Sequence, residues 1–363
     1  MRKIILLIAC IALWGLCKAQ EGYRITGNLG QLQQDTFYLV VPNLDGTVNI
    51  LGVSILKDGN IEFQGQVPEP VMARIMTSDQ QGTIPLMLEN ANYSICIGAE
   101  AIVVEGGAEQ VVFNQFNVLQ RDAARQQQKL QTDIKTAYEE GNQMRVQGLS
   151  GRAQKFMQDV QKRQMEIVKQ NANTSTAAYI VLASGMQEPL EQLQILYNLL
   201  GERAQTSIYG KMIATQLVEL GKISEGKIAP DFMMYTPEGK SVSLYGVKTR
   251  VKLVDFWASW CSPCRAENPN VIRLYKKYHS KGLEVVGFSL DSDKSKWVQA
   301  IMEDGLPWLN GSDLKGQASE VAQLYRVRSI PFTLLLDEDN RIVGKNLRGK
   351  ELTRKIEELL KSK

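Results

Sequence analysis

The pattern of hydrophobic and polar positions changes twice along the chain. Residues 22–113 carry short segments with the two-residue period of a strand, whereas residues 114–221 repeat apolar positions at helical spacing. From Ile228 onward, strand-like and helix-like segments alternate. After a leader at residues 1–19, these changes predict three parts, which are residues 20–113, 114–221 and 222–363.

The first part contains five short segments that alternate or are rich in β-forming residues, and turn signals such as Asp45-Gly46 separate them. Strands this short and evenly spaced predict a small antiparallel sandwich or barrel. The part holds no histidine and no glycine-rich phosphate loop, so we expect either a docking or dimerisation module or a passive folding unit. The segments are Tyr23–Thr26, Thr36–Val41, Asn60–Val67, Val71–Met76 and Tyr93–Ile97.

The middle part is rich in glutamine and predicts long amphipathic helices. Two long segments meet near Gly141, which predicts a helical hairpin whose apolar stripe is buried by packing. Asn173-Thr174-Ser175 offers the cap of a further helix, and Glu188-Pro189 fits the start of another. Gly221 is expected to end the last helix of this part, ahead of a linker over Lys222–Lys227.

The third part predicts an α/β fold. A βαβ unit, a hairpin that turns at 337–340 and a closing helix would form a mixed sheet covered on both faces. The fold class is therefore a multi-domain chain with a β-sandwich-like domain, a helical region and an α/β domain. The expected strands are 251–257, 284–290, 332–336 and 341–344, and the expected helices are 261–279, 294–304, 317–325 and 350–362.

The leader has the pattern of a secretory signal. Arg2 and Lys3 precede the apolar stretch Ile4–Leu16, and the small residues of Cys17-Lys18-Ala19 fit a cleavage site before Gln20. This predicts export to the periplasm or cell envelope by ordinary cleavage, with lipid anchoring at Cys10 or Cys17 or an uncleaved anchor as the alternatives. Cys10 leaves a short apolar region before it, and the bulky Leu16 before Cys17 fits a lipidation site poorly. No later segment has about 18 consecutive apolar residues, so we expect the remainder to be soluble.

Charge and cysteine content narrow the function further. The net charge of +3, from 42 basic and 39 acidic residues, argues against a nucleic-acid or membrane-surface partner. Outside the leader only Cys96, Cys261 and Cys264 remain, which is too few for a disulfide-stapled scaffold. Cys96 lies in an alternating segment and is expected to be a buried, free thiol.

The chemistry is concentrated in Cys261-Ser-Pro-Cys264. The apolar run Val251–Trp257 ends just before this motif, and a helix-like segment follows it. The unpaired N–H groups and the dipole at a helix N-terminus stabilise a thiolate. The motif therefore predicts thiol-disulfide exchange, in which an exposed Cys261 attacks and Cys264, one turn inward and more buried, resolves the mixed disulfide.

Two other uses of the cysteine pair fit less well. A zinc site needs two more ligands, and only Cys96 and His279 remain, both in unrelated segments, so neither a metal nor a cofactor is predicted. A thiol peroxidase would carry the pattern Pro-x-x-x-Thr-x-x-Cys. Val254 and Ala258 occupy the proline and threonine positions before Cys261, so the threonine that activates peroxide is missing.

The motif and its surroundings resemble the thioredoxin superfamily, and within it the TlpA/ResA-type thiol-disulfide oxidoreductases related to AhpC/TSA proteins. The resemblance covers about residues 222–363, while residues 22–221 are more loosely similar to the regions that precede such domains in Bacteroidetes-like envelope proteins. It rests on Asp255 before the motif, Trp260 beside Cys261, Glu267 and Pro269 after it, and the segments Gly226–Phe232 and Val327–Phe332.

The resemblance implies a role for each of these side chains. Asp255 would be a buried acid with a raised pKa that takes the proton from Cys264, and Glu267, three residues after Cys264, would be a second candidate base. Pro331 is expected to be cis, with the backbone of Ile330 pairing with the substrate chain. Trp260 would provide apolar contact surface beside the dithiol.

We therefore expect an exported protein-disulfide reductase whose partners are cysteine-containing envelope proteins and a membrane electron donor. The Ser262-Pro263 dipeptide lacks the histidine typical of strong oxidants of the superfamily, which favours the reducing direction. The competing hypothesis is an envelope binding or scaffold protein in which the redox module is secondary. No feature of the sequence predicts an oligomeric state.

Overall fold

The computed structural model describes residues 22–30, 35–43, 46–79, 82–98, 101–185 and 188–361. The chain falls into two compact units, one up to Ser184 with Ile195–Met212 and the other formed by Gly185–Gln194 and Ile213 onward. The expected leader lies outside the described residues. Within the described ranges, no helix is both long enough and apolar enough to cross a membrane.

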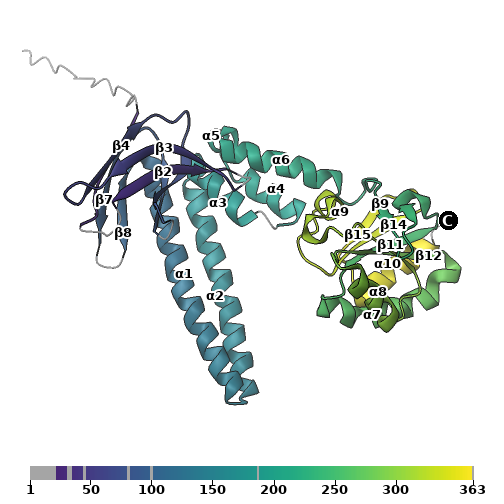
Figure 1. The fold of residues 1–363 in the computed structure, drawn as a ribbon. Coiled ribbons are helices and arrows are strands. Elements are labelled where there is room, and N and C mark those ends of the chain that lie inside the picture. Colours follow the sequence, from purple (N-terminus) through teal and green to yellow (C-terminus); the bar gives the residue numbers. More distant parts are fainter. Residues whose placement is uncertain are drawn as a thin grey trace, which may run out of the picture. The chain divides into compact units, whose positions relative to one another are not determined.

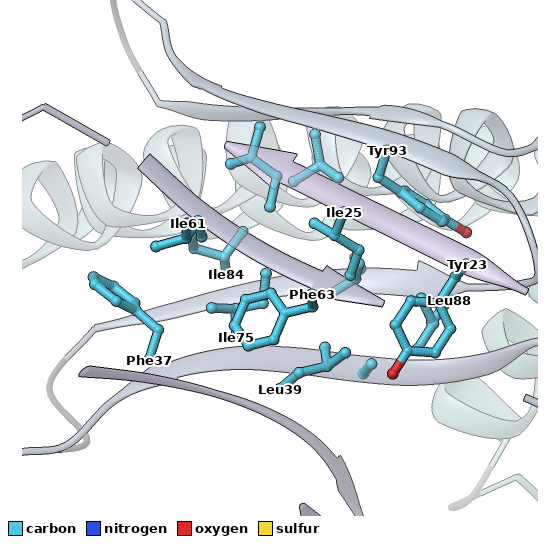
Figure 2. Close-up of a cluster of buried hydrophobic side chains, with 14 of the residues drawn as sticks. Tyr23, Ile25, Phe37, Leu39, Ile61, Phe63, Ile75, Ile84, Leu88 and Tyr93 are labelled. Atoms are coloured by element: carbon cyan, nitrogen blue, oxygen red, sulfur yellow. The ribbon is translucent and has the colours of Figure 1, made fainter. Parts of the chain in front are cut away.

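The β-rich part of the first unit is a sandwich of two four-stranded sheets, with the orders β4-β1-β7-β8 and β3-β2-β5-β6. Figure 2 shows how side chains of both sheets, such as Ile25, Phe63 and Leu39, meet in one buried cluster. The predicted sandwich is thus confirmed. Its strands are β1 (Tyr23–Asn28), β2 (Thr36–Pro42), β3 (Val48–Ile55), β4 (Asn60–Gly65), β5 (Val71–Thr77), β6 (Thr83–Leu88), β7 (Asn92–Ile97) and β8 (Ile102–Gly106).

Two expectations for this part are wrong. The sheets are not purely antiparallel, because β7 crosses from the other sheet and pairs with β1 in the same direction, with Arg24 opposite Asn92. Cys96 is exposed rather than buried, although it is a free thiol. In β7 Tyr93 and Ile95 face the core, and the two-residue period of a strand then turns Cys96 outward.

The predicted helical hairpin is confirmed. Helices α1 (Ala108–Glu139) and α2 (Gln143–Gln170) lie side by side and bury Leu130, Ala137 and Leu149 between them (Figure 1). Gly141 adopts a positive φ of 67° in the turn, and the side chain of Asn142 caps α2 by accepting the N–H of Arg145 at 3.0 Å.

The shorter helices of the middle region follow. As expected, Thr174 caps α3, because its hydroxyl accepts the N–H of Ala177 at 3.1 Å, and Pro189 precedes α4. Gly221 does not end the last helix, since α6 continues through it, and a glycine inside a helix costs only about 1 kcal/mol. The helices are α3 (Ser175–Gly185), α4 (Leu190–Asn198), α5 (Glu202–Thr206) and α6 (Ile208–Lys222).

The second unit is built on a seven-stranded mixed sheet with the order β10-β9-β13-β12-β11-β14-β15. Strand β11 lies at its centre, parallel to β12 and antiparallel to β14. The expected mixed sheet is confirmed, but the short strands β9, β10 and β13 were not predicted. The strands are β9 (Met233–Tyr235), β10 (Ser241–Ser243), β11 (Val251–Trp257), β12 (Leu283–Ser289), β13 (Leu309–Ser312), β14 (Phe332–Asp337) and β15 (Ile342–Lys345).

Both faces of this sheet are covered, as expected. Leu253 and Trp257 of β11 pack with residues of α7, α8 and α10, whereas Val254 and Phe256 pack on the opposite face with residues of α9. The helices are α7 (Ser262–Tyr278), α8 (Lys294–Asp304), α9 (Glu320–Leu324) and α10 (Gly349–Lys361), with the 3₁₀ helices η1 (Leu244–Gly246), η2 (His279–Lys281) and η3 (Gly316–Ala318).

Candidate active site

The two cysteines of the motif form a disulfide at the start of α7, with a Cα–Cα distance of 5.3 Å. Cys261 is the N-cap residue, and its Sγ accepts the backbone N–H of Cys264 at 3.2 Å. The sulfur of Cys261 therefore lies at the helix end where unpaired N–H groups and the dipole favour negative charge. Once reduced, Cys261 has the surroundings that stabilise a thiolate.

Both sulfurs belong to the buried core in this disulfide form. Cys261 is 4% exposed and Cys264 is 2% exposed, so the expectation of an exposed Cys261 is wrong for this state. The reason is that the pair packs into the same apolar cluster as Trp257 and Val271. Trp260 is 57% exposed and offers an apolar surface immediately before the pair, as expected.

Asp255 lies on β11, on the sheet face that carries the cysteines. Its position alternates with Val254 and Phe256 and matches that of Leu253 and Trp257, which pack in the cysteine cluster. The side chain is 6% exposed, and burial raises its pKa to about 7. The carboxylate charge of Glu267 raises this pKa further, whereas the guanidinium of Arg348 lowers it.

Glu267 is half-buried on α7, and its carboxylate accepts a hydrogen bond from Asn270 Nδ2 at 2.8 Å. It lines a groove of about 490 Å³ formed by residues of α7 and α10, together with the basic side chains Arg273, Lys350 and Arg354. Glu267 therefore lines a groove at the surface of this domain, and its charge also acts on the carboxyl of Asp255.

The peptide bond between Ile330 and Pro331 is cis, as predicted. The side chain of Ile330 packs against the core cluster that contains Cys261 and Cys264. The guanidinium of Arg348 donates a hydrogen bond to the carbonyl oxygen of Pro331. Arg348 therefore links the cis-proline segment to the charge balance of Asp255, a role that the sequence analysis missed because Arg348 belongs to no motif.

A second buried acid, also missed from the sequence, holds the loop before Cys261. Asp291 is 1% exposed, and its carboxylate accepts the backbone N–H of Ser259 at 2.9 Å and the hydroxyl of Ser259 at 2.6 Å. The hydroxyl of Ser289 donates a further bond at 2.7 Å. Asp291 comes shortly after the buried strand β12 and belongs to no motif, so only the folded chain reveals its role.

Ser259 is also held from α7. Arg265 Nη1 donates to the Ser259 carbonyl oxygen at 3.3 Å, and Arg265 Nη2 donates to Asp304 Oδ1 at 2.7 Å. Asn268 Nδ2 bonds the same Asp304 carboxylate at 2.6 Å, so α7 and α8 are joined by a polar cluster. The loop that leads into Cys261 is thus fixed by side chains of two different segments.

Among the residues with a described position, no group of three or more His, Cys, Asp and Glu side chains could hold a metal ion.

The comparisons with known proteins agree with this geometry. Residues 224–360 match the Redoxin family model, and residues 23–113 match a domain of unknown function (DUF4369). The thiol-disulfide oxidoreductase ResA of Bacillus thuringiensis subsp. konkukian is 30% identical over 140 residues, which are 39% of this chain and 79% of that protein. The chain belongs to the ResA-type thiol-disulfide oxidoreductases. The predicted family is thereby confirmed, and the protein is an enzyme of thiol-disulfide exchange with a thioredoxin-like C-terminal domain.

Other relatives are similar to a comparable share of this ResA-type chain. The thioredoxin-like protein YneN of Bacillus subtilis is 36% identical over 141 residues, which are 37% of this chain and 80% of that protein. A solved thiol-disulfide oxidoreductase from Bacteroides fragilis is 35% identical and covers 37% of this chain and 99% of that one, with a TM-score of 0.35. A thioredoxin domain from Bacteroides vulgatus is 34% identical and covers 38% of this chain and 98% of that one, with a TM-score of 0.36.

Proposed function

We propose that the protein is an exported reductant. Its Cys261–Cys264 dithiol would reduce disulfides in cysteine-containing envelope proteins, and a membrane electron donor would reduce it again. The observation that carries this proposal is the placement of Cys261 at the N-cap of α7 with the buried Asp255 on the same side of the sheet. The secretory pattern of residues 1–19 supports export.

The reaction proceeds in two exchanges. The Cys261 thiolate attacks one sulfur of the substrate disulfide, so a mixed disulfide forms and the other substrate sulfur leaves as a thiolate. Cys264 then loses its proton and attacks Cys261 Sγ. This second step releases the remaining substrate thiolate and leaves the Cys261–Cys264 disulfide, so two electrons have passed to the substrate.

Asp255 would take the proton of Cys264. A general base works best when its pKa lies near the working pH, and burial brings the pKa of Asp255 to about 7. Glu267 would carry the proton on toward the surface groove that it lines with other residues of α7 and α10. The exposed indole of Trp260 and the backbone at Ile330 would contact the substrate chain on either side of the disulfide.

The reduction potential of the Cys261–Cys264 couple tests the direction. Equilibration of the full chain with glutathione redox buffers, followed by quantitation of the two thiols, should give a value below about −200 mV, in the range of reducing thioredoxin-like proteins. A value near about −120 mV, which is typical of a strong oxidant, would refute the reducing role while leaving the exchange chemistry intact.

A further inference from the structure

A pocket of about 480 Å³ in the second unit takes no part in the mechanism above. It lies between the C-terminal end of α6 and the segment that joins α9 to β14. Three cationic side chains and one carboxylate line it, together with neutral residues such as Gln317 and Gln323. The charged residues are Lys222, Arg326, Arg328 and Glu219.

Two of these cations form no ion pair, and the one carboxylate of the lining, Glu219, is shared, since the pKa of this carboxyl is lowered first by its bond with Lys222 and also by the charge of Arg326. Lys222 Nζ pairs with Glu219 Oε1 at 2.6 Å, but in the described part of the chain neither Arg326 nor Arg328 forms a side-chain hydrogen bond or an ion pair. Burial lowers the pKa of Arg328, and the neighbouring charge of Arg326 lowers it further. The two guanidiniums therefore repel each other, and an anion between them would relieve this repulsion.

The backbone at Arg326 favours a different residue. Arg326 adopts a φ of 52° directly after α9, where its N–H donates to the Gln323 carbonyl and the N–H of Val327 donates to the Ala322 carbonyl at 2.8 Å. This is the Schellman arrangement, whose left-handed position is best filled by glycine. An arginine at this position makes the turn less stable than a glycine would. We therefore look for the use of Arg326 in its long cationic side chain and not in the turn.

The pocket is next to the place where the substrate chain would lie. Arg328 precedes Ile330 by two residues, which corresponds to at most about 7 Å of backbone. Ile330 in turn packs against the cluster that holds Cys261 and Cys264. A peptide whose disulfide is attacked by Cys261, and which pairs with the backbone at Ile330, would continue past Arg328.

We propose that Arg326 and Arg328 form a subsite for an acidic side chain of the substrate protein, close in sequence to the cysteine under attack. This inference rests on the proposed function and adds a substrate class to it, namely disulfides in acidic segments. The attraction acts before and during the first exchange and forms no new bond. It raises the rate of association and orients the substrate chain along the cis-proline segment.

The test uses three synthetic peptides that share one intramolecular disulfide and differ only in two flanking residues, which are aspartates, asparagines or lysines. Stopped-flow fluorescence gives the second-order rate constant of the reduced full chain with each peptide at about 20 mM and about 500 mM salt. The variants are Arg326→Gly, Arg328→Gln and the double substitution. Lys240→Gln is the control, because it removes one exposed positive charge elsewhere in the same unit.

At low salt we expect the acidic peptide to react about fivefold faster than the neutral one, and the lysine peptide to react more slowly than both. High salt or the double substitution should bring these ratios close to one, whereas Lys240→Gln should keep them. Arg326→Gly should also raise the thermal midpoint by about 2 °C, since glycine suits the turn. This combination of higher stability and lost preference separates a binding role from a structural one.

Each other outcome counts against the subsite. Equal rates for the three peptides with the unmodified chain would overturn it and leave the proposed function intact. A preference for the acidic peptide that survives the double substitution would place the recognition elsewhere. If none of the peptides were reduced, the proposed function would fail, and the subsite with it.

Discussion

The carboxylate of Asp291 binds Ser259 twice, once at its backbone N–H at 2.9 Å and once at its hydroxyl at 2.6 Å. Ser259 stands two residues before Cys261, so this pair of bonds sets the course of the chain into the N-cap of α7. The buried acid has a further bond from Ser289 and is almost fully shielded from solvent. Its position explains how a loop outside any strand or helix can hold the attacking sulfur in place.

Asp291→Asn should weaken this support. An amide has one acceptor oxygen in place of two, so at least one of the three bonds is lost or must reverse its direction. We expect the free energy of unfolding to fall by about 1–3 kcal/mol and the rate of the first exchange by Cys261 to fall about tenfold. Urea titration measures the first quantity, and stopped-flow reaction with a small aromatic disulfide measures the second.

The control for this prediction is Asp293→Asn, which removes the same charge two residues away. Asp293 caps α8 by accepting the N–H of Ser295 at 2.9 Å, and asparagine caps as well as aspartate. Both quantities should therefore change little in the control. Loss of stability in Asp291→Asn with an unchanged exchange rate would reduce Asp291 to a structural residue.

The order of attack predicts opposite phenotypes for the two cysteines. Cys261→Ser should abolish disulfide reduction, because no nucleophile remains at the helix N-terminus. Cys264→Ser should allow the first exchange and block the second, so mixed disulfides with the substrate should accumulate. Mass spectrometry of the quenched reaction detects them. If iodoacetamide labelled Cys264 before Cys261 in the reduced protein at neutral pH, the roles would be reversed.

Gly287 lies in β12, next to Asp255 of β11, at a position with no room for a larger side chain. A Cβ atom there would lie 2.5 Å from Asn310 Oδ1, 3.1 Å from Trp308 Nε1 and 3.2 Å from Trp257 Nε1. All three side chains are buried, so they have little room to move, and Gly287→Ala should destabilise the fold by about 1–3 kcal/mol. Gly221→Ala, inside α6 with no atom within 4 Å of the added Cβ, should instead stabilise by up to about 1 kcal/mol. Denaturant unfolding of both variants compares the two signs.

Much of the C-terminal fold could be predicted because its signals are local. The run 251–257 is buried at every position, and the Asp293 cap fixes the start of α8 at Lys294, so these elements match their predictions. Strand β13 could not be predicted, because Leu309-Asn-Gly-Ser312 has little β preference and is ordered by its pairing with β12 and β9. Cys96 shows a similar limit, since alternation identifies two faces of a strand and not which of them is buried.

The residues of the active site also form two groups, those that the sequence identifies and those that only the folded chain reveals. Cys261 and Cys264 could be identified from their motif, and Asp255 and Pro331 from the resemblance to the thioredoxin superfamily. Arg348 and Asp291 act through distant contacts, one with the Pro331 carbonyl and the other with Ser259, and only the folded chain brings these groups together. The sequence alone does not show which loops meet at the ends of neighbouring strands, and the side chains that support the site lie in such loops.

Asp255→Asn should separate the two exchange steps. The first attack by Cys261 does not need the carboxyl and should keep nearly its full rate, whereas the attack by Cys264 loses its base and should slow by roughly 10²–10⁴-fold. Stopped-flow traces of the fluorescence of Trp260 resolve the two phases. Glu267→Gln is the matched variant, because it removes the second candidate carboxyl, which is half-buried rather than buried, and we expect it to slow the second phase less. Equal slowing of both phases in Asp255→Asn would argue for a structural role.

The raised pKa of Asp255 also predicts how stability depends on pH. The native carboxyl, with a pKa of about 7, keeps its proton between about pH 4 and pH 7, whereas the unfolded one, with an ordinary pKa of 3.8, has lost it. The native state therefore loses stability from this group progressively between about pH 4 and pH 7, and the loss is complete above pH 7, where both states are ionised. Asparagine never ionises, so Asp255→Asn should be more stable than the unmodified protein above pH 7, by up to about 4 kcal/mol, and the difference should shrink toward pH 4. Urea unfolding of both proteins from pH 4 to pH 9 measures this difference in the free energy of unfolding. If the difference stayed constant across the range, Asp255 would be ionised with an ordinary pKa.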